Sequence, residues 1–266
     1  MRTQKKLISK GEIYFAPISA FEDQFDCHID IKMAPATLQE RFTHLSRHLQ
    51  VSNASLTPIQ AAVHAQLRSG FGKAFPYVSE SELKARARKT MSERNGILSL
   101  SRTLASFRMW EKYGDNHRGI CVGLSPVGLD RFIEDFARGN RKTFLFRRQS
   151  VSYRAALPTL NPFRDHDNES IRNSLMTKTP EWKFEEEERI VMAQDLPPEH
   201  AKTLETADRT LTLPKDVIEE VWLGKDAPHE TQEQVQLILS KTKSTTALFK
   251  VIHIDCDGHI FYERLQ

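Results

Sequence analysis

The chain has 266 residues, of which 39% are hydrophobic and 27% are charged, and its formal net charge at pH 7 is +3. This composition is typical of a folded globular protein and excludes a disordered or fibrous chain. No apolar run approaches the roughly 20 residues that cross a bilayer, so we expect no membrane partner. The weak positive charge leaves nucleic acid open as a partner without favouring it.

Cysteine usage and the start of the sequence bear on the cellular compartment. Cys27, Cys121 and Cys256 are odd in number and far apart in the sequence, a pattern that indicates reduced thiols and not a disulfide framework. Residues 1–6 are basic but are not followed by an apolar stretch, so no export signal is predicted. We therefore expect a cytoplasmic protein.

The predicted elements of the first half are a short strand, a helical block and a small α/β segment. A strand is predicted at Glu12–Ala16, and helices fill most of Ala36–Arg94, with breaks where glycine and proline occur. Short apolar runs then predict buried strands around a helix. These three elements are Ile97–Leu100 (strand), Leu104–Tyr113 (helix) and Ile120–Leu124 (strand).

The second half is predicted to be richer in strands. A helix at Val127–Ala137 and an extended segment at Lys142–Tyr153 precede a strand that begins near Glu185. Further strands are expected at Leu211–Leu213 and Glu220–Leu223, a helix at Thr231–Leu239, and a hairpin at Leu248–Arg264 that turns at Asp257-Gly258. The sequence thus predicts an α+β fold. We expect a single domain over residues 1–266, with a mixed or split β-sheet core and a helical block in the N-terminal half.

Trp110, Tyr113 and His117 form the first candidate site. Spacings of three and four would place them on one face of a helix that continues to His117. They would then form an aromatic and imidazole wall that stacks on a flat ring. The alternative is structural, with the two aromatic residues in the core and His117 at the helix C-terminus.

Glu185, Glu187 and Arg189 form the second candidate site. On a strand that begins at Glu185, alternation would point all three side chains to one face. Two carboxylates beside a guanidinium can act as acid, base or ribose anchor. Alternatively, the four consecutive glutamates belong to a solvated helix.

Other polar groups are weaker candidates. An acidic, aromatic loop holds Phe21, Asp23, Phe25 and Asp26, and a structural role is the simpler reading of it. Two polar groups have metal-ligand spacing. They are the pair His44 and His48 and the set His253, Asp255 and Asp257. The helical pair lacks a third ligand and an HExxH pattern, the polar face of a hairpin explains the other set, and no metal is expected. The basic segment Lys84–Arg94 could contact phosphates.

Three segments carry a family resemblance: IYFAPISAFEDQFDC, SLSRTLASFRMWEKYGDNHRGICVGL and PEWKFEEEERIV. They resemble a bacterial family of unknown function whose members are often labelled abortive-phage-infection-like. The family pattern falls on three sets of residues. These are Phe15, Phe21, Asp23, Phe25 and Asp26; Met109, Trp110, Tyr113, His117 and Gly119; and Trp182, Phe184, Glu185, Glu187 and Arg189.

The sequence departs from this family pattern in two respects. Glu22 and Gln24 stand where the family usually has Asn and Pro. Family members also usually carry an earlier strand with a Tyr-Lys-Tyr-like segment, which would lie upstream of Met1. If that strand normally supplies part of the site, a chain without it would be inactive, and the resemblance leaves this question open.

The layout of this family is similar, more loosely, to the ADP-ribosyltransferase superfamily, which implies a split sheet that binds NAD in a cleft. The implied function is ADP-ribose transfer or NAD cleavage in a defence or toxin setting, with NAD as substrate and an unknown macromolecular acceptor. Glu187 would stabilise the ribosyl transition state and Glu185 would orient the acceptor. Trp110 and Tyr113 would stack on a ring, while His117 and Arg189 would address phosphate or hold the acids. Two alternatives stay open, a non-enzymatic nucleotide- or phage-protein-sensing module and a nucleic-acid-directed effector.

Overall fold

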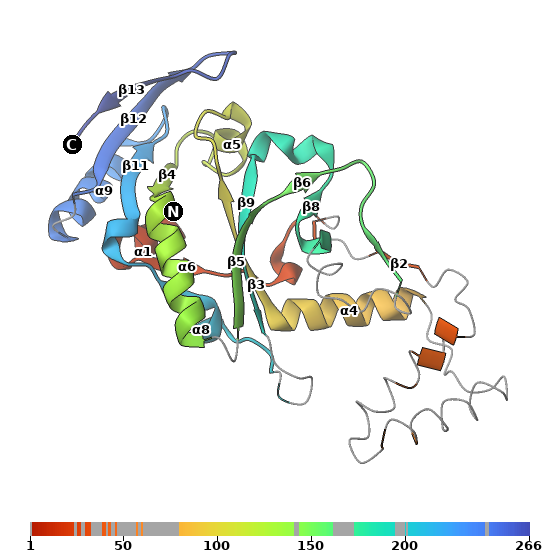
Figure 1. Cartoon of the computed structure of the whole chain (residues 1–266). Helices are drawn as coiled ribbons and strands as arrows, with labels where there is room; N and C mark the ends of the chain where they lie inside the picture. Colours follow the sequence, from red (N-terminus) through yellow and green to blue (C-terminus); the bar gives the residue numbers. More distant parts are fainter. Residues whose placement is uncertain are drawn as a thin grey trace. The chain divides into compact units, whose positions relative to one another are not determined.

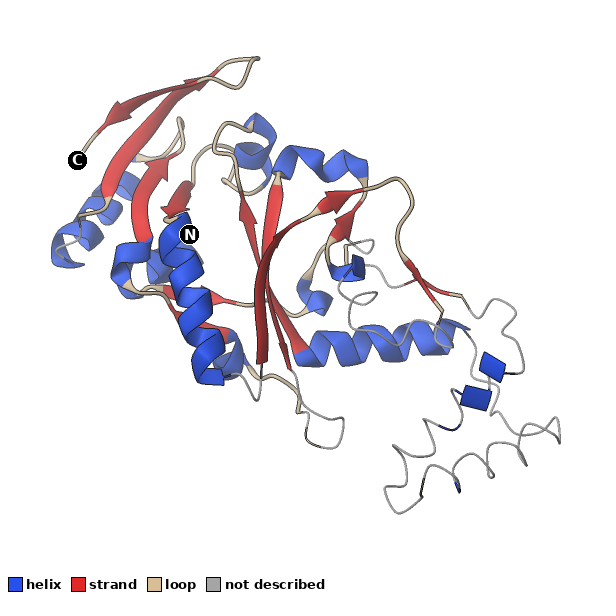
Figure 2. Cartoon of the chain, viewed as in Figure 1, coloured by secondary structure: helices blue, strands red, loops and turns tan. Residues whose placement is uncertain are grey.

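The computed structural model describes residues 2–23, 26–27, 30–32, 39–40, 42–43, 46, 57, 60, 80–140, 144–161, 173–194, 200, 202–242 and 245–266. The chain divides into two compact units. The first unit combines residues 1–21, 92–153 and 179–266, and the second combines residues 22–91 and 154–178. Figures 1 and 2 show helices and strands in both units. The fold is α+β, as the sequence predicted, while the single domain stays a prediction.

A three-stranded antiparallel sheet lies at the centre of the first unit. Its order is β3 (Asn95–Ser101), β9 (Glu187–Gln194) and β5 (Phe144–Ser150). Ile190 and Met192 of β9 are fully buried and belong to one core cluster with Phe146 of β5. The central strand thus has one apolar face, and that face fixes its register against its neighbours.

Helix α6 (Pro126–Asn140) covers the apolar face of this sheet (Figure 1). Ser125 begins the helix, because its Oγ accepts a hydrogen bond from the Gly128 N–H at 3.3 Å. The ring of Phe136 packs against that of Phe146, with 4.6 Å between the centroids. The helix ends at Asn140, as the Gly139-Asn140 pair predicted.

A four-stranded mixed sheet forms the second layer of the same unit. Its order is β13 (Ile260–Arg264), β12 (Ala247–Ile254), β11 (Ile218–Leu223) and β4 (Ile120–Leu124), and only β11 and β12 are parallel. Apolar residues of α9 (His229–Thr242) and α1 (Arg2–Lys10) form a core with this sheet. The predicted terminal hairpin is confirmed as β12 and β13.

The remaining elements are short. In the first unit they are β1 (Glu12–Tyr14), which pairs with β10 (Thr210–Thr212), and α5 (Phe107–Lys112), α8 (Thr206–Arg209), β6 (Ser152–Tyr153), η1 (Ile18–Ala20), η2 (Pro180–Glu185) and η3 (Lys215–Val217). The second unit holds β2 (Asp30–Ile31), which pairs with β7 (Thr159–Leu160), and β8 (Thr177–Lys178). Helix α4 (Glu80–Arg94) runs through the end of the predicted helical block, and most of residues 36–79 lie outside the described residues. Among the described helices, none is both long and apolar enough to cross a bilayer.

Arg209 ties the start of β3 to the segment before β10. Its side chain is buried, and the guanidinium donates to the carbonyl oxygens of Leu204 at 3.0 Å, Asn95 at 2.6 Å and Ser92 at 2.7 Å. Burial lowers the pKa of Arg209 from its usual value. The carbonyl groups compensate for this burial, because a buried charge without such partners is strongly unfavourable.

We predict that Arg209→Met lowers the free energy of unfolding by about 3 kcal/mol, because several buried carbonyl groups lose their donor. Urea denaturation followed by circular dichroism measures the effect. Arg131→Met is the matched control, since the Arg131 side chain is 66% exposed. Equal stability of the two variants would contradict a structural role for Arg209.

Candidate functional site

The motif that begins at Trp110 folds as a short helix followed by a left-handed turn. Helix α5 ends at Lys112, and Asp115, Asn116 and His117 then have positive φ angles of 50°, 51° and 64°. Asp and Asn tolerate this conformation better than most residues. Gly114 precedes the turn at a close approach, because a Cβ atom there would lie 2.7 Å from the Trp110 carbonyl oxygen.

This turn corrects the predicted helix. Trp110, Tyr113 and His117 do not share one helical face, because the helix stops before Tyr113. Trp110 is 4% exposed and belongs to a core cluster with Trp222 and Val251. Tyr113, in contrast, is 52% exposed.

His117 is buried in the turn. Its ring lies 4.4 Å from the ring of Phe107, between centroids, and is stacked at 6.4 Å with that of Trp110. Neither ring nitrogen has a hydrogen-bond partner among the described residues. Burial lowers the pKa of His117, and the positive charge of Lys225 lowers it further. Trp110 thus lies in the core, as the structural alternative expected, whereas His117 does not cap the helix C-terminus but is buried in the turn that follows it.

The strand of the acidic motif begins later than predicted. Glu185 is the last residue of η2, Glu186 has left-handed φ and ψ angles of 42° and 49°, and β9 begins only at Glu187. The predicted strand start at Glu185 is therefore wrong by two residues. Glu185 and Glu187 are nevertheless both buried, at 3% and 4% exposure.

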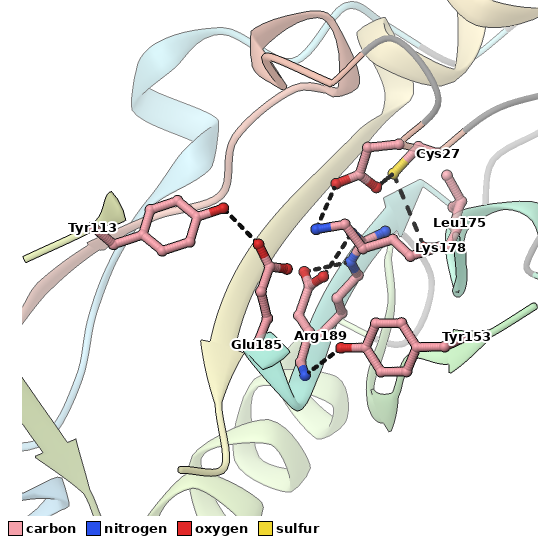
Figure 3. A network of polar contacts seen from close by, with 9 residues as sticks. Cys27, Tyr113, Tyr153, Leu175, Lys178, Glu185 and Arg189 are labelled. Atoms are coloured by element: carbon pink, nitrogen blue, oxygen red, sulfur yellow. Dashed lines mark hydrogen bonds and ion pairs between the residues drawn. The ribbon is translucent and has the colours of Figure 1, made fainter. Parts of the chain in front are cut away.

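Glu187 and Arg189 form a bidentate ion pair on one face of β9. Arg189 is fully buried, and its Nε and Nη2 atoms donate to Oε1 and Oε2 of Glu187 at 2.6 and 2.9 Å. The Tyr153 Oη accepts a hydrogen bond from the Glu187 N–H at 2.7 Å (Figure 3). The predicted shared face is thus present for these two residues.

Glu185 faces the first motif. The Tyr113 Oη donates to Oε1 of Glu185 at 2.6 Å, across 72 residues of sequence (Figure 3). Two cation–π contacts hold α5 and η2 together around this hydrogen bond. Arg108 lies 4.1 Å from the Phe184 ring centroid, and Lys112 lies 4.7 Å from that of Trp182.

A pocket of about 450 Å³ opens beside Tyr113, a size typical of small-molecule sites. Its wall includes Asp115 and Arg118 from the left-handed turn, Gln4 from α1 and Thr231 from α9. Tyr113 therefore lies between this pocket and Glu185. The sequence reasoning missed these four residues. Asp115 and Arg118 lie inside the segment of the aromatic motif, but no periodicity links Gln4 or Thr231 to it.

Two residues of the acidic, aromatic loop make contacts of their own. The Arg189 guanidinium lies 5.5 Å from the Phe21 ring centroid in the first unit. In the second unit, Asp26 is buried and forms an ion pair with Lys178 at 3.1 Å. Phe25, His44 and His48 lie outside the described residues.

The hairpin set differs from its prediction by one residue. His259, instead of His253, groups with Asp255 and Asp257. The Asp255 carboxylate accepts hydrogen bonds from the N–H groups of Asp257 and His259 at 3.0 and 2.8 Å, and these bonds lower its pKa. This group therefore stabilises the turn of the hairpin.

Comparison with known proteins adds one match. Residues 109–190 match a family described as a protein of unknown function (DUF2971). The matched segment begins at Met109, the first residue of the aromatic motif, and ends one residue after Arg189, so it contains both halves of the candidate site. No curated protein and no solved structure matches the chain.

We predict that His117 makes the protein less stable in acid. Its folded-state pKa is lowered, so the unfolded chain takes up a proton below about pH 6.5 that the folded chain does not. The free energy of unfolding should then fall by up to about 1.4 kcal/mol per pH unit, and His117→Asn should remove this contribution. Urea titrations between pH 7.5 and 5 measure it.

His229→Asn is the control for this experiment, because the His229 side chain is 80% exposed. Asn suits position 117, since it tolerates a positive φ angle. A His117→Asn protein with the same pH slope as the wild type would show that another group causes the loss of stability.

Proposed function

We propose that the protein cleaves NAD at the bond between nicotinamide and ribose, and transfers ADP-ribose to a macromolecular acceptor in a bacterial defence setting. The observation that supports this is the buried Glu185 carboxylate, which the exposed Tyr113 joins by a hydrogen bond to a pocket of ligand size. A preorganised carboxylate stabilises the positive charge that develops on a ribosyl group when its bond to nicotinamide breaks. The proposal requires no metal ion.

The geometry favours Glu185 as the acid that touches the ribose. Glu187 has both carboxylate oxygens bound by Arg189. We therefore assign Glu187 to positioning, in place of the principal catalytic role that the sequence suggested. Arg189 holds the start of β9, and the tyrosine hydroxyl orients Glu185. Tyr113 also offers an exposed ring for stacking.

A binding module without chemistry is the second candidate function. The observation that favours it is that each of the two carboxylates already has a protein partner, Tyr113 for Glu185 and Arg189 for Glu187. Such a module would hold a nucleotide in the same place and leave it intact. A nucleic-acid effector has less support, because two cations of α4 form ion pairs, Lys84 with Asp30 and Arg86 with Glu82.

The test incubates the purified chain with NAD labelled in the nicotinamide ring, with and without cell lysate. We expect the wild type to release nicotinamide and Glu185→Gln to reduce the rate by at least about 100-fold, since removing preorganised charge costs that much in other enzymes. Glu186→Gln is the matched control, because Glu186 is the exposed neighbour of both buried acids. Its rate should equal that of the wild type.

Glu187→Gln answers a different question. It leaves the buried Arg189 without a full charge partner, so we expect a folding defect of about 3 kcal/mol or more. The activity test therefore depends on Glu185→Gln, in which the Gln side-chain oxygen can still accept from Tyr113. A Glu185→Gln protein as active as the wild type would remove Glu185 from the mechanism. A wild type that binds NAD and releases no nicotinamide would favour the binding module.

A further inference from the structure

The pocket beside Tyr113 has polar groups on its wall that the protein does not satisfy. The Oε1 atom of Gln4 is buried and has no hydrogen-bond partner within the described ranges. Thr231 is 7% exposed, and its hydroxyl group likewise makes no hydrogen bond to a described residue. Buried polar groups are nearly always paired. The buried, unpaired Gln4 oxygen and the pocket-lining Thr231 hydroxyl group therefore indicate a polar ligand.

The charged groups of the pocket indicate what this ligand carries. Asp115 and Arg118 are exposed, and among the described residues neither forms an ion pair. Asp115 begins the left-handed turn, Arg118 directly follows it, and each lines the same pocket. A carboxylate binds vicinal hydroxyl groups, and a guanidinium matches the geometry of a phosphate.

The position of Thr231 supports an anionic group next to Arg118. The N–H of Thr231 donates to the Pro228 carbonyl oxygen at 2.9 Å, so Thr231 lies in the first turn of the 14-residue helix α9. Pro228 and Thr231 both line the pocket. The N-terminal end of a helix carries a partial positive charge that favours phosphate.

We propose that this pocket binds the nucleoside monophosphate portion of a nucleotide. The base stacks on the ring of Tyr113, the ribose hydroxyl groups donate to Asp115, and the phosphate binds Arg118 and the hydroxyl group of Thr231. Gln4 pairs with a donor of the base. A free phosphate does not suit a pocket that also holds a carboxylate, and a neutral sugar leaves Arg118 without a partner. A nucleotide meets both requirements.

This inference deepens the proposed function and rests on it for one point, the position of the bond that is cleaved. When the nicotinamide nucleotide half of NAD lies against Tyr113, the hydrogen bond between Tyr113 and Glu185 brings the acid next to that bond. AMP is the stable probe of the nucleoside monophosphate chemistry that both halves share. Nucleotide binding itself depends only on the pocket, so it can be tested without catalysis.

The experiment titrates the full chain with 5′-AMP, adenosine and inorganic phosphate by isothermal calorimetry. We expect AMP to bind at least about 10-fold more tightly than adenosine, and phosphate alone not to bind measurably. Arg118→Gln should remove the advantage of AMP over adenosine, whereas Asp115→Asn should weaken both. Arg131→Gln, an exposed arginine on α6, should bind like the wild type.

Thr231→Val gives a second and independent readout. It removes a hydroxyl group that has no described protein partner, so the thermal midpoint should stay the same or rise, while AMP affinity falls about 3- to 10-fold. Replacement of a purely structural threonine would lower the thermal midpoint and leave the AMP affinity unchanged. Lower stability with unchanged AMP affinity would therefore contradict the inference.

The inference is overturned if AMP does not bind, if phosphate binds as tightly as AMP, or if Arg118→Gln and Thr231→Val bind AMP as the wild type does. These results are distinguishable from a failure of the proposed function. A protein that releases nicotinamide but does not bind AMP would keep the function and overturn the inference. A protein that binds AMP through Arg118 but releases no nicotinamide would do the reverse.

Discussion

The buried guanidinium of Arg189 is the constraint on which the candidate site depends. Arg189 lies on the central strand of the three-stranded sheet with no exposed surface, and a charge in such a place requires a counter-charge. Glu187 provides it with both carboxylate oxygens. Because the Glu187 N–H also donates to Tyr153, the first residue of β9 is held by its backbone and its side chain. The strand does not continue into the residue before it.

That residue is Glu186, which has a left-handed backbone conformation. It separates the two buried acids Glu185 and Glu187, which have different surroundings. Glu187 points to Arg189, whereas Glu185 reaches Tyr113. The aromatic motif uses the same conformation in the turn from Asp115 to His117. Residues with positive φ thus determine, in both motifs, where the neighbouring side chains point. Such positions carry strain that the surrounding contacts have to offset.

Much of the fold could be predicted from the sequence, because hydrophobic periodicity and turn residues report local structure directly. The strands of both sheets, helix α6 with its Gly139-Asn140 end and the hairpin at Asp257-Gly258 are all visible in this way. Helix α1 was not predicted, since residues 2–10 are mainly polar and gain their helical stability from packing, as Ile8 in the core shows.

The candidate site could be predicted only in part, because periodicity reports only regular local structure. The residue types of both motifs indicated a site, and Tyr113 and Glu185 do meet. However, the expected helix through His117 and strand from Glu185 assumed regular periods, and left-handed residues other than glycine interrupt both. Gln4 and Thr231 lie 227 residues apart, and only the packing of α1 on α9 brings them to one pocket. That packing includes a hydrogen bond from Lys5 to Gln234, which no local pattern indicates.

The segment that matches the family does not form a complete structural unit. Residues 109–190 include the first part of β9 and all of β4, but the strands that pair with them on one side, β3 and β11, lie outside the match. The Tyr113–Glu185 pair therefore depends on a sheet that is completed by other parts of the chain. The pocket divides in the same way, because Asp115 and Arg118 lie inside the matched segment, whereas Gln4 and Thr231 lie outside it. The buried ion pair of Glu187 and Arg189, in contrast, lies entirely inside the matched segment, so the match contains the charged core of the site and only part of the pocket wall.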